Sequence, residues 1–295
     1  MSARPRDSVS DVDELMEQRI VNLVDVSGFM YRAFYAFPSL TYNDAEVGAL
    51  YGFCVTMLKL IPRFPSSMFI AACDSGRRTF RNEIYDGYKA NRLKTPDALL
   101  TQIPLIKEAC RKFGFSTVEA PGFEADDIIA TYVAKLSGNH RLNIISSDKD
   151  LMQLIGSGIT MYDPAKQRYV TEDDVIRKFG VTSNKVLDVL ALTGDSSDNI
   201  PGVAGIGPKT AAAWISEFGS VENLIANIAR LPRNRKRQLL EEGTTSAVMS
   251  KELAALRYDL NLPFAYGISV PCKLPAFFAR HGFNSLLKMM GEYEL

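Results

Sequence analysis

The stretch RIVNLVDV at residues 19–26 decides the fold of this chain. It is apolar and rich in β-branched residues, which predicts a buried strand, and this strand ends at an acid, Asp25. The same arrangement occurs twice more, as MFIAAC (68–73) before Asp74 and LNIISS (142–147) before Asp148. Three predicted strands therefore each carry a carboxylate at their carboxyl end.

Segments with apolar residues at helical spacing lie between these strands, for example residues 47–61 and 128–136, and a fourth strand is expected at 159–162. This alternation predicts an α/β fold with a central, mostly parallel sheet. Ligands of such sheets bind at the carboxyl ends of the strands, so we expect the three aspartates at one edge. From residue 181 onward, glycine and proline separate short helices, which predicts a second, mainly helical region.

The composition is that of an ordinary soluble globular protein, with 295 residues, of which 46% are hydrophobic and 23% charged. The 34 basic and 34 acidic residues cancel, which by itself is weak support for nucleic-acid binding. The charges are unevenly spread, however. Residues 77–94 contain six bases and two acids, and residues 230–237 contain five bases and no acid. Basic surfaces and an acidic cluster can therefore coexist in this neutral chain.

Several classes of protein are disfavoured by what the chain lacks. No apolar run approaches the roughly 18 residues of a membrane span, so no membrane partner is expected. The four cysteines are scattered without a C-x-x-C pair, which predicts buried, reduced thiols and argues against zinc. Residues 1–18 are polar and contain five acids, so we expect a flexible tail and a bacterial cytoplasmic location, not a mitochondrial or secreted protein.

Dense acidic sets accompany the aspartates that follow the strands. The sequence GFEADDIIA (122–130) places three acids at a predicted helix N-terminus, where the helix dipole favours negative charge. The sequences SSDKDL (146–151) and GDSSDN (194–199) each contain a pair of aspartates. The candidate metal-binding carboxylates are Asp25, Asp74, Glu124, Asp126, Asp127, Asp148, Asp150, Asp195 and Asp198.

Convergence of these carboxylates would be costly without cations. Two unit charges about 4 Å apart repel by roughly 4 kcal/mol at an effective dielectric near 20, so either pKa values rise or cations neutralise the site. Oxygen ligands without histidine or cysteine select Mg²⁺ or Mn²⁺, and a pair of such ions can clamp a phosphodiester. The residues alone leave an alternative open, because acids after strands and at helix N-termini are often turn or capping residues.

The glycine-rich sequence GVAGIGPKT (202–210) predicts a tight turn between two helices. An NTPase phosphate loop needs lysine directly after the second glycine of its G-x-x-x-x-G spacing, but here Pro208 intervenes, so ATP binding is not expected. A helix-hairpin-helix element fits better, because glycine amides can approach a duplex phosphate and Lys209 adds charge. Trp214 is interpreted as a core residue, whereas the basic run 230–237 fits either a solvated surface or a duplex contact.

Together, five segments resemble the 5′ nuclease domain of bacterial DNA polymerase I and, more broadly, the flap endonuclease family with its PIN-like core. These segments are LVDVSGFMYRAF (23–34), FRNEIYDGYKANR (80–92), FEADDIIA (123–130), SSDKDLMQL (146–154) and LTGDSSDNIPGVAGIGPKTA (192–211). The likeness covers residues from about 20 to 295. One departure is Val26, which stands where the family usually has glycine.

The resemblance implies a PIN-like catalytic domain at residues 19–180, with a helical arch near 76–112, and a helical DNA-binding region at 181–295 with a helix-three-turn-helix element. It implies two divalent metal ions in the active site and a K⁺ ion at the glycine hairpin. The first metal would be held mostly by Asp25, Asp74, Glu124, Asp126 and Asp127, and the second mostly by Asp148, Asp150, Asp195 and Asp198.

The resemblance also implies contacts with the substrate. Near the scissile phosphate it places Arg81, Lys89 and Arg92, with Lys89 stabilising charge in the transition state. The expected DNA-binding residues are Arg32, Tyr88, Gly202, Gly205, Gly207, Lys209 and Thr210.

The expected activity is that of a structure-specific 5′-3′ exonuclease and flap endonuclease, acting on DNA and RNA primers near a free 5′ end, alone or beside a DNA polymerase. A PIN-type ribonuclease and a non-catalytic DNA-structure-binding protein are the alternatives. The basic arch and the hairpin argue against the first alternative, and the complete set of acids argues against the second.

Overall fold

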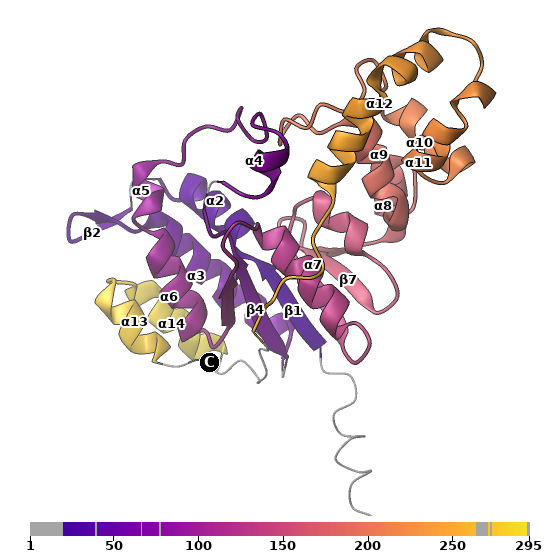
Figure 1. Ribbon diagram of the computed structural model, residues 1–295. Helices are drawn as coiled ribbons and strands as arrows, with labels where there is room; N and C mark the ends of the chain where they lie inside the picture. Colours follow the sequence, from indigo (N-terminus) through magenta and orange to yellow (C-terminus); the bar gives the residue numbers. More distant parts are fainter. Residues whose placement is uncertain are drawn as a thin grey trace, which may run out of the picture.

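The computed structural model describes residues 20–38, 40–65, 67–76, 78–263, 271 and 273–293, and the predicted tail at residues 1–18 lies outside this range. A six-stranded sheet forms the centre of one half of the molecule (Figure 1). Neighbouring strands are parallel, except that β8 runs antiparallel to β7. In spatial order the strands are β5 (Ser116–Glu119), β4 (Met68–Cys73), β1 (Ile20–Asp25), β6 (Arg141–Ile145), β7 (Ile159–Asp163) and β8 (Arg168–Val170). The predicted α/β fold with a mostly parallel sheet is confirmed.

Alternation along the strands builds an apolar core on each face of the sheet. On β1, Val21 and Leu23 join the core that contains α7 (Ala125–Leu136), whereas Val24 joins the core on the opposite face. The helices of that second core include α2 (Val26–Ala36), α3 (Gly48–Leu60) and α6 (Ile103–Lys112). Both faces of the sheet are covered, so its carboxyl edge is where polar groups can meet solvent and ligands.

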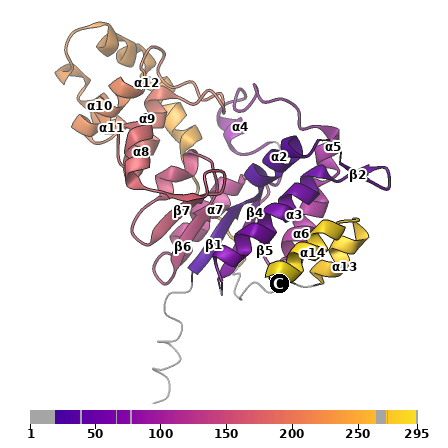
Figure 2. The same ribbon diagram turned by 180° about the vertical axis from the view of Figure 1, so that it is seen from behind.

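The second region is helical, as expected, and stands beside the sheet at the α7 side (Figure 2). Its helices are α8 (Glu172–Phe179), α9 (Val186–Thr193), α10 (Pro208–Phe218), α11 (Val221–Ala226) and α12 (Arg235–Ala254). Short 3-10 turns connect the elements of both regions, at Ile61–Arg63, Asp150–Leu154, Ser183–Lys185 and Ile228–Arg230. Helices α9 and α12 pack against each other and share the core of the α7 face.

The last two helices depart from the predicted region at 181–295. Helices α13 (Leu274–Arg280) and α14 (Asn284–Tyr293) lie beside α3 and α6, away from the helical region, in both views (Figure 1, Figure 2). Phe278 is fully buried there, with its ring 6.2 Å from that of Phe113 on the other side of the contact. The apolar faces of these helices complete the core around α2, α3 and α6, so they lie apart from the other helices of the region predicted at 181–295.

The expected helical arch near 76–112 is only partly helical. In its described residues it holds α4 (Arg81–Ile84), a series of turns and α5 (Asp97–Leu100), before α6 returns to the sheet. Glycine, asparagine and proline in residues 87–96 interrupt helical hydrogen bonding, which accounts for the difference. The sequence analysis also missed β5, β8 and the hairpin of β2 (Thr41–Tyr42) and β3 (Ala45–Glu46), which are short strands with few apolar residues.

Two expectations from composition can be compared with the described residues. Cys54, Cys73 and Cys110 are buried free thiols, as predicted, while Cys272 lies outside the described range. Among the described helices, none has the length and apolar character needed to cross a membrane.

Replacing Phe278 by alanine tests whether the C-terminal helices pack on the half of the molecule that contains the six-stranded sheet. Loss of this fully buried ring should lower the free energy of unfolding by about 3–5 kcal/mol. The half-exposed Ile176 on α8 provides the control, since Ile176→Ala should change stability by only about 0.5 kcal/mol. Urea unfolding followed by circular dichroism measures both, and a Phe278→Ala protein as stable as the control would contradict this packing.

Candidate active site

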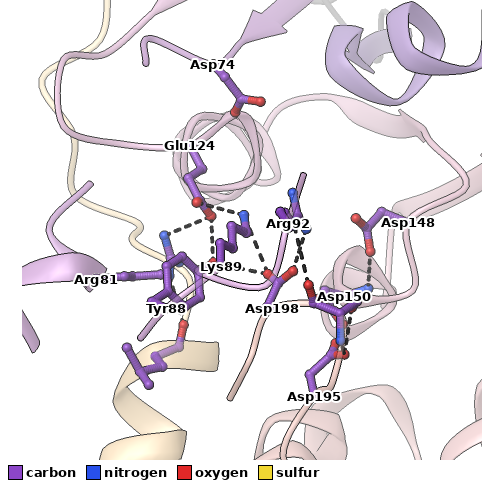
Figure 3. A network of polar contacts seen from close by, with 12 residues as sticks. Asp74, Arg81, Tyr88, Lys89, Arg92, Glu124, Asp148, Asp150, Asp195 and Asp198 are labelled. Carbon is purple, nitrogen blue, oxygen red and sulfur yellow. Dashed lines mark hydrogen bonds and ion pairs between the residues drawn. The ribbon is translucent and has the colours of Figure 1, made fainter. Parts of the chain in front are cut away.

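Six of the nine candidate carboxylates line one pocket of about 300 Å³ at the carboxyl edge of the sheet. These six are Asp25, Asp74, Glu124, Asp126, Asp148 and Asp198. Tyr31, Lys89 and Arg92 line the same pocket, so acidic and basic side chains face one another across it. Figure 3 shows the polar network that joins most of these groups.

The ends of β1 and β4 place Asp25 and Asp74. Asp25 caps α2 by accepting from the amide of Gly28 at 3.3 Å, and it accepts from the Ser146 hydroxyl at 2.8 Å. Burial raises the pKa of Asp25 to about 6, although the Ser146 hydrogen bond opposes the rise. Asp74 accepts from the Ser27 hydroxyl at 2.6 Å and from the amide of Ala125 at 2.8 Å, which attaches it to the first turn of α7.

The N-terminus of α7 supplies Glu124 and Asp126 to the pocket. Asp126 is partly buried, and desolvation, followed by repulsion from Asp148 and Asp25, raises its pKa well above the ordinary value. Asp25 of β1, Asp126 of α7 and Asp148 of the loop after β6 line the same pocket. The expected convergence at the sheet edge is therefore present for these acids.

The loop after β6 carries Asp148 and Asp150, and the loop after α9 carries Asp195. The amide of Asp150 donates to the carboxylate of Asp148 at 2.9 Å. Burial, with repulsion from Asp148 and Asp195, raises the pKa of Asp150 to about 7. Burial would raise the pKa of Asp195 too, but hydrogen bonds from Lys149 and Ser197 outweigh it and lower the pKa. The Lys149 ammonium lies 2.6 Å from Asp195 and supplies local positive charge.

Lys89 and Arg92 bring positive charge into the pocket from the segment between α4 and α5. The Lys89 ammonium lies 2.7 Å from Glu124 and 3.5 Å from Asp198, and the Arg92 guanidinium pairs with Asp198 (Figure 3). Burial alone would lower the pKa of Lys89, but Glu124 and Asp198 outweigh this effect and raise it. Lys89 therefore remains protonated and partly neutralises the acids.

Arg81, expected near the scissile phosphate, and Asp127, expected as a metal ligand, lie outside the lining of the pocket. Arg81 is 2% exposed and donates to both oxygens of Asp127, at 2.7 and 2.8 Å. Arg81 also donates to the backbone carbonyls of Leu253 and Ala255 at the end of α12, and Asp127 accepts from the amide of Arg257. The two side chains form a buried link between α4, α7 and α12, so neither faces the pocket. Asp126, the neighbouring residue on α7, lines the pocket instead.

Two expected DNA contacts are also buried. Tyr88 is 4% exposed, and its hydroxyl donates toward Glu124 at 3.0 Å and Asp198 at 3.1 Å, so its ring has no free face for a base. Gly202 is buried with a φ of +61°, and a Cβ at this position would lie 2.3 Å from the amide nitrogen of Gly194. This glycine is required for backbone packing, which is a different role from the expected DNA contact.

The other expected DNA contacts lie at the surface. Gly205, Gly207 and Lys209 are exposed just before and at the start of α10, and Thr210 accepts from the Lys236 ammonium at 2.9 Å. Trp214 is half-buried and packs on the core, as expected, but it also lines a cavity of about 350 Å³ beside Lys209 and Lys236. Arg32 is exposed on α2 and donates to the Ser147 hydroxyl at 2.8 Å.

The sequence analysis overlooked the residues that hold the acids in place. Ser27 and Ser146 donate to Asp74 and Asp25, and Lys149 pairs with Asp195. Lys149 stands between two of the candidate acids in SSDKDL, so its charge was a usable signal. The two serines gave no such signal, because hydroxyls are common in loops.

The donor set fits divalent metal ions, although its side chains are paired with protein cations here. Within the described part of the chain, no three Asp, Glu, His or Cys side chains are arranged as a preformed metal site. One carboxylate oxygen of Asp150 is nevertheless buried without a hydrogen-bond partner. Burial, together with repulsion from neighbouring acids, also raises the pKa values of Asp25, Asp126 and Asp150, an effect that a bound cation would oppose. Oxygen donors in this condition suit a hard cation such as Mg²⁺.

Comparison with known proteins identifies the family. A model described as "5′-3′ exonuclease, N-terminal resolvase-like domain" matches residues 20–180, and one described as "5′-3′ exonuclease, C-terminal SAM fold" matches residues 181–269. The chain belongs to the 5′-3′ exonuclease family. Members of this family are nucleases that hydrolyse phosphodiesters, and metal dependence is typical of them.

Two curated relatives place the chain within this family. It is 41% identical to DNA polymerase I of Rhizobium leguminosarum over 254 residues, covering 81% of this chain and 25% of the relative. It is 38% identical to the 5′-3′ exonuclease of Aquifex aeolicus over 242 residues, covering 81% of this chain and 82% of the relative. The chain therefore spans about a quarter of the length of the polymerase and most of the length of the exonuclease.

Solved structures support the fold. T5 5′-exonuclease with bound zinc superposes with a TM-score of 0.69 at 23% identity, covering 93% of this chain and 98% of the T5 chain. The catalytic core of Rad2 in complex with DNA substrate gives a TM-score of 0.58 at 18% identity, covering 95% of this chain and 92% of Rad2. At these identities the likeness concerns the fold alone.

The Asp127→Asn variant distinguishes a buried structural partner from a metal ligand. It leaves the Arg81 guanidinium short of a buried partner, so the free energy of unfolding in EDTA should fall by about 3–5 kcal/mol. The matched variant Asp148→Asn removes a charge from the repelling acids and should leave stability in EDTA unchanged or raise it. Urea unfolding measures both, and equal effects would contradict the distinction.

Asp150 should make the stability of the metal-free protein depend on pH. Its pKa is raised from 3.8 to about 7, so between these values the folded state holds a proton that the unfolded state has released. The free energy of unfolding should therefore fall as pH rises from about 5 to about 7, by on the order of 2 kcal/mol from this group. Denaturation in EDTA measures this slope, which should be smaller in Asp150→Asn; the same slope in both proteins would exclude Asp150 as its source.

Proposed function

We propose that this chain hydrolyses phosphodiester bonds in DNA near a free 5′ end, as a 5′-3′ exonuclease and as a flap endonuclease. The observation that carries the proposal is the pocket in which six carboxylates face Lys89 and Arg92. Phosphodiester hydrolysis needs positive charge on the phosphoryl oxygens and an activated water, and this pocket can provide both.

Two divalent ions, Mg²⁺ or Mn²⁺, are proposed as the cofactors. Asp25, Asp74, Glu124 and Asp126 would hold mainly one ion, and Asp148, Asp150, Asp195 and Asp198 mainly the other; Asp127 is left out because Arg81 occupies both of its oxygens. Bound ions would supply activation of the attacking water and stabilisation of the leaving oxygen. Ser27 and Ser146 keep Asp74 and Asp25 oriented toward the pocket.

Lys89 and Arg92 are proposed to bind the phosphate next to the bond that is cut. Lys89 pairs with Glu124 and Asp198, and Arg92 pairs with Asp198. Both side chains line the pocket from the segment between α4 and α5. When cations neutralise the acids, these two side chains are released to pair with a phosphate. The side chain of Lys89 is shorter than that of Arg92 and less exposed, so Lys89 is the candidate for stabilising charge in the transition state.

The exposed hairpin before α10 is proposed to grip the duplex part of the substrate. Gly205 and Gly207 expose backbone, and Lys209 and Lys236 add charge beside it, so contacts would go to phosphates and not to base edges. Such binding is independent of sequence and sensitive to salt. A K⁺ ion held by hairpin carbonyls is part of the same proposal.

The biological setting follows from this chemistry. We propose that the substrates are DNA with a 5′ flap or 5′ end and RNA primers, processed in the bacterial cytoplasm at the nucleoid during replication and repair. Residues 20–180 would form the catalytic part and the helical region the duplex-binding part. A DNA polymerase, in the same protein or a separate one, is the proposed functional partner, since several relatives of this chain are DNA polymerases I.

The direct test is Asp148→Asn combined with Asp150→Asn, assayed on a 5′-labelled and a 3′-labelled flap duplex with Mg²⁺. Loss of two proposed ligands should reduce cleavage at least about a hundredfold, because their charge positions the catalytic ions. A double variant of exposed acids, Asp173→Asn with Asp259→Asn, makes the same charge change and should cut normally. Full cleavage by Asp148→Asn with Asp150→Asn would refute the assignment.

The same assay separates the two alternative functions. Cleavage of structured RNA with the flap DNA left intact would favour a PIN-type ribonuclease. Binding of the flap without cleavage in Mg²⁺ or Mn²⁺, at an affinity unaffected by EDTA, would favour a non-catalytic binding protein. Mapping both labels reports the polarity and the position of the cut.

A further inference from the structure

An apolar cavity of about 250 Å³ opens directly beside the carboxylate pocket. Val26 and Met30 of α2, Cys73 of β4 and Ile106 of α6 form its buried floor. Leu100 at the end of α5 is 42% exposed and forms part of its rim, together with Ile103. Nothing in the hydrolysis described above uses this cavity.

The cavity and the carboxylate pocket are contiguous. Both are lined by Ser27, Tyr31 and Asp74, so a group held among the acids lies next to the apolar walls. The Tyr31 hydroxyl is within hydrogen-bond distance of the Thr95 hydroxyl, at 2.9 Å, which connects α2 to the segment that leads into α5. The cavity is therefore bounded by the same segment that carries Lys89 and Arg92.

The polar groups around the cavity are already engaged in contacts with the protein. Ser75 donates to the carbonyl of Ala120 at 2.8 Å, and Lys107 pairs with Glu119 at 2.6 Å. The walls that remain are apolar, so a charged group would lose hydration there without compensation. A largely apolar group therefore fits this cavity better than a phosphate does.

We propose that this cavity accepts one unpaired nucleobase of the 5′ arm, from the nucleotide that adjoins the bond to be cut. The inference rests on the proposed function, which places a phosphodiester among the carboxylates next door. The nucleobase is the only large apolar part of a nucleotide, and every base has an apolar face, so the site would be indifferent to sequence. A base can enter only after leaving its stack, which is easiest in a single strand, and this would select the unpaired arm.

The cleavage test uses flap duplexes that differ by one abasic nucleotide, placed on the 5′ side or the 3′ side of the cut. The proposal predicts that wild-type protein cuts the substrate with the 5′-side abasic nucleotide about tenfold more slowly, because the base no longer contributes binding. Leu100→Trp fills the cavity and should slow cleavage of the intact flap by a similar factor, while the abasic substrate is cut at the wild-type abasic rate. Ile176→Trp on α8, at a residue 43% exposed, is the matched control and should behave as wild type.

A binding test separates this proposal from the proposed function. With EDTA present, a flap containing 2-aminopurine at the same nucleotide should change its fluorescence on binding to wild-type protein and to Ile176→Trp, but much less on binding to Leu100→Trp. This result would support the base site even if no substrate were cut. Equal rates on intact and abasic flaps, or the same fluorescence change in all three proteins, would overturn it. Circular dichroism of Leu100→Trp establishes that a lost signal is not a folding defect.

Discussion

Mutual repulsion among carboxylates at one edge of the sheet is the constraint on which the rest of this structure depends. Burial disfavours the charged form of a carboxyl group, and here it raises the pKa of Asp25 and of Asp126. Protein cations offset part of the cost, because Lys89 and Arg92 reach Glu124 and Asp198, and Lys149 reaches Asp195. The protein cations therefore neutralise the site only in part, and the carboxylates remain available to divalent cations.

The buried pair of Arg81 and Asp127 has a structural role, because it fixes the first turn of α7 to the rest of the protein. The first turn of this helix must present acids to the pocket while the helix itself stays fixed to the protein. Asp127 receives two hydrogen bonds from Arg81 and one from the amide of Arg257, so it is fully satisfied in the interior. Arg81 extends the link to the end of α12, and the helical region is thereby attached directly to the helix that carries Glu124 and Asp126.

The sequence was sufficient to predict the sheet and most of the acids, because both follow from local patterns. Apolar runs that end in aspartate predicted the ends of β1 and β4, and Asp25 and Asp74 are at those ends. Local sequence patterns were not sufficient where the position of a side chain depended on the rotation of a helix about its axis. Residues 124–127 can present different acids to the pocket depending on the rotation of α7. That rotation is set by long-range contacts, namely the packing of α7 on the sheet and the hydrogen bonds of Asp127 with Arg81 and the amide of Arg257. The packing of α13 and α14 on α3 and α6 could not be predicted either. An apolar helix face indicates that the helix is buried but does not indicate which element it packs against.

The backbone of the turn that carries Lys89 is held by hydrogen bonds that do not involve the Lys89 ammonium. Lys89 has a φ of +54°, a conformation that costs a non-glycine residue on the order of 1 kcal/mol, and so it must be held by its surroundings. Its backbone amide donates to the carbonyl of Asp198 at 2.8 Å, and the Asn199 side chain donates to the carbonyl of Gly87 at 2.6 Å. These bonds involve backbone groups of the turn, so its position does not depend on the ion pairs that Lys89 and Arg92 make with Glu124 and Asp198. In the proposed function, the Lys89 ammonium would move from a carboxylate to a phosphate while these backbone hydrogen bonds hold the turn against the loop of Asp198.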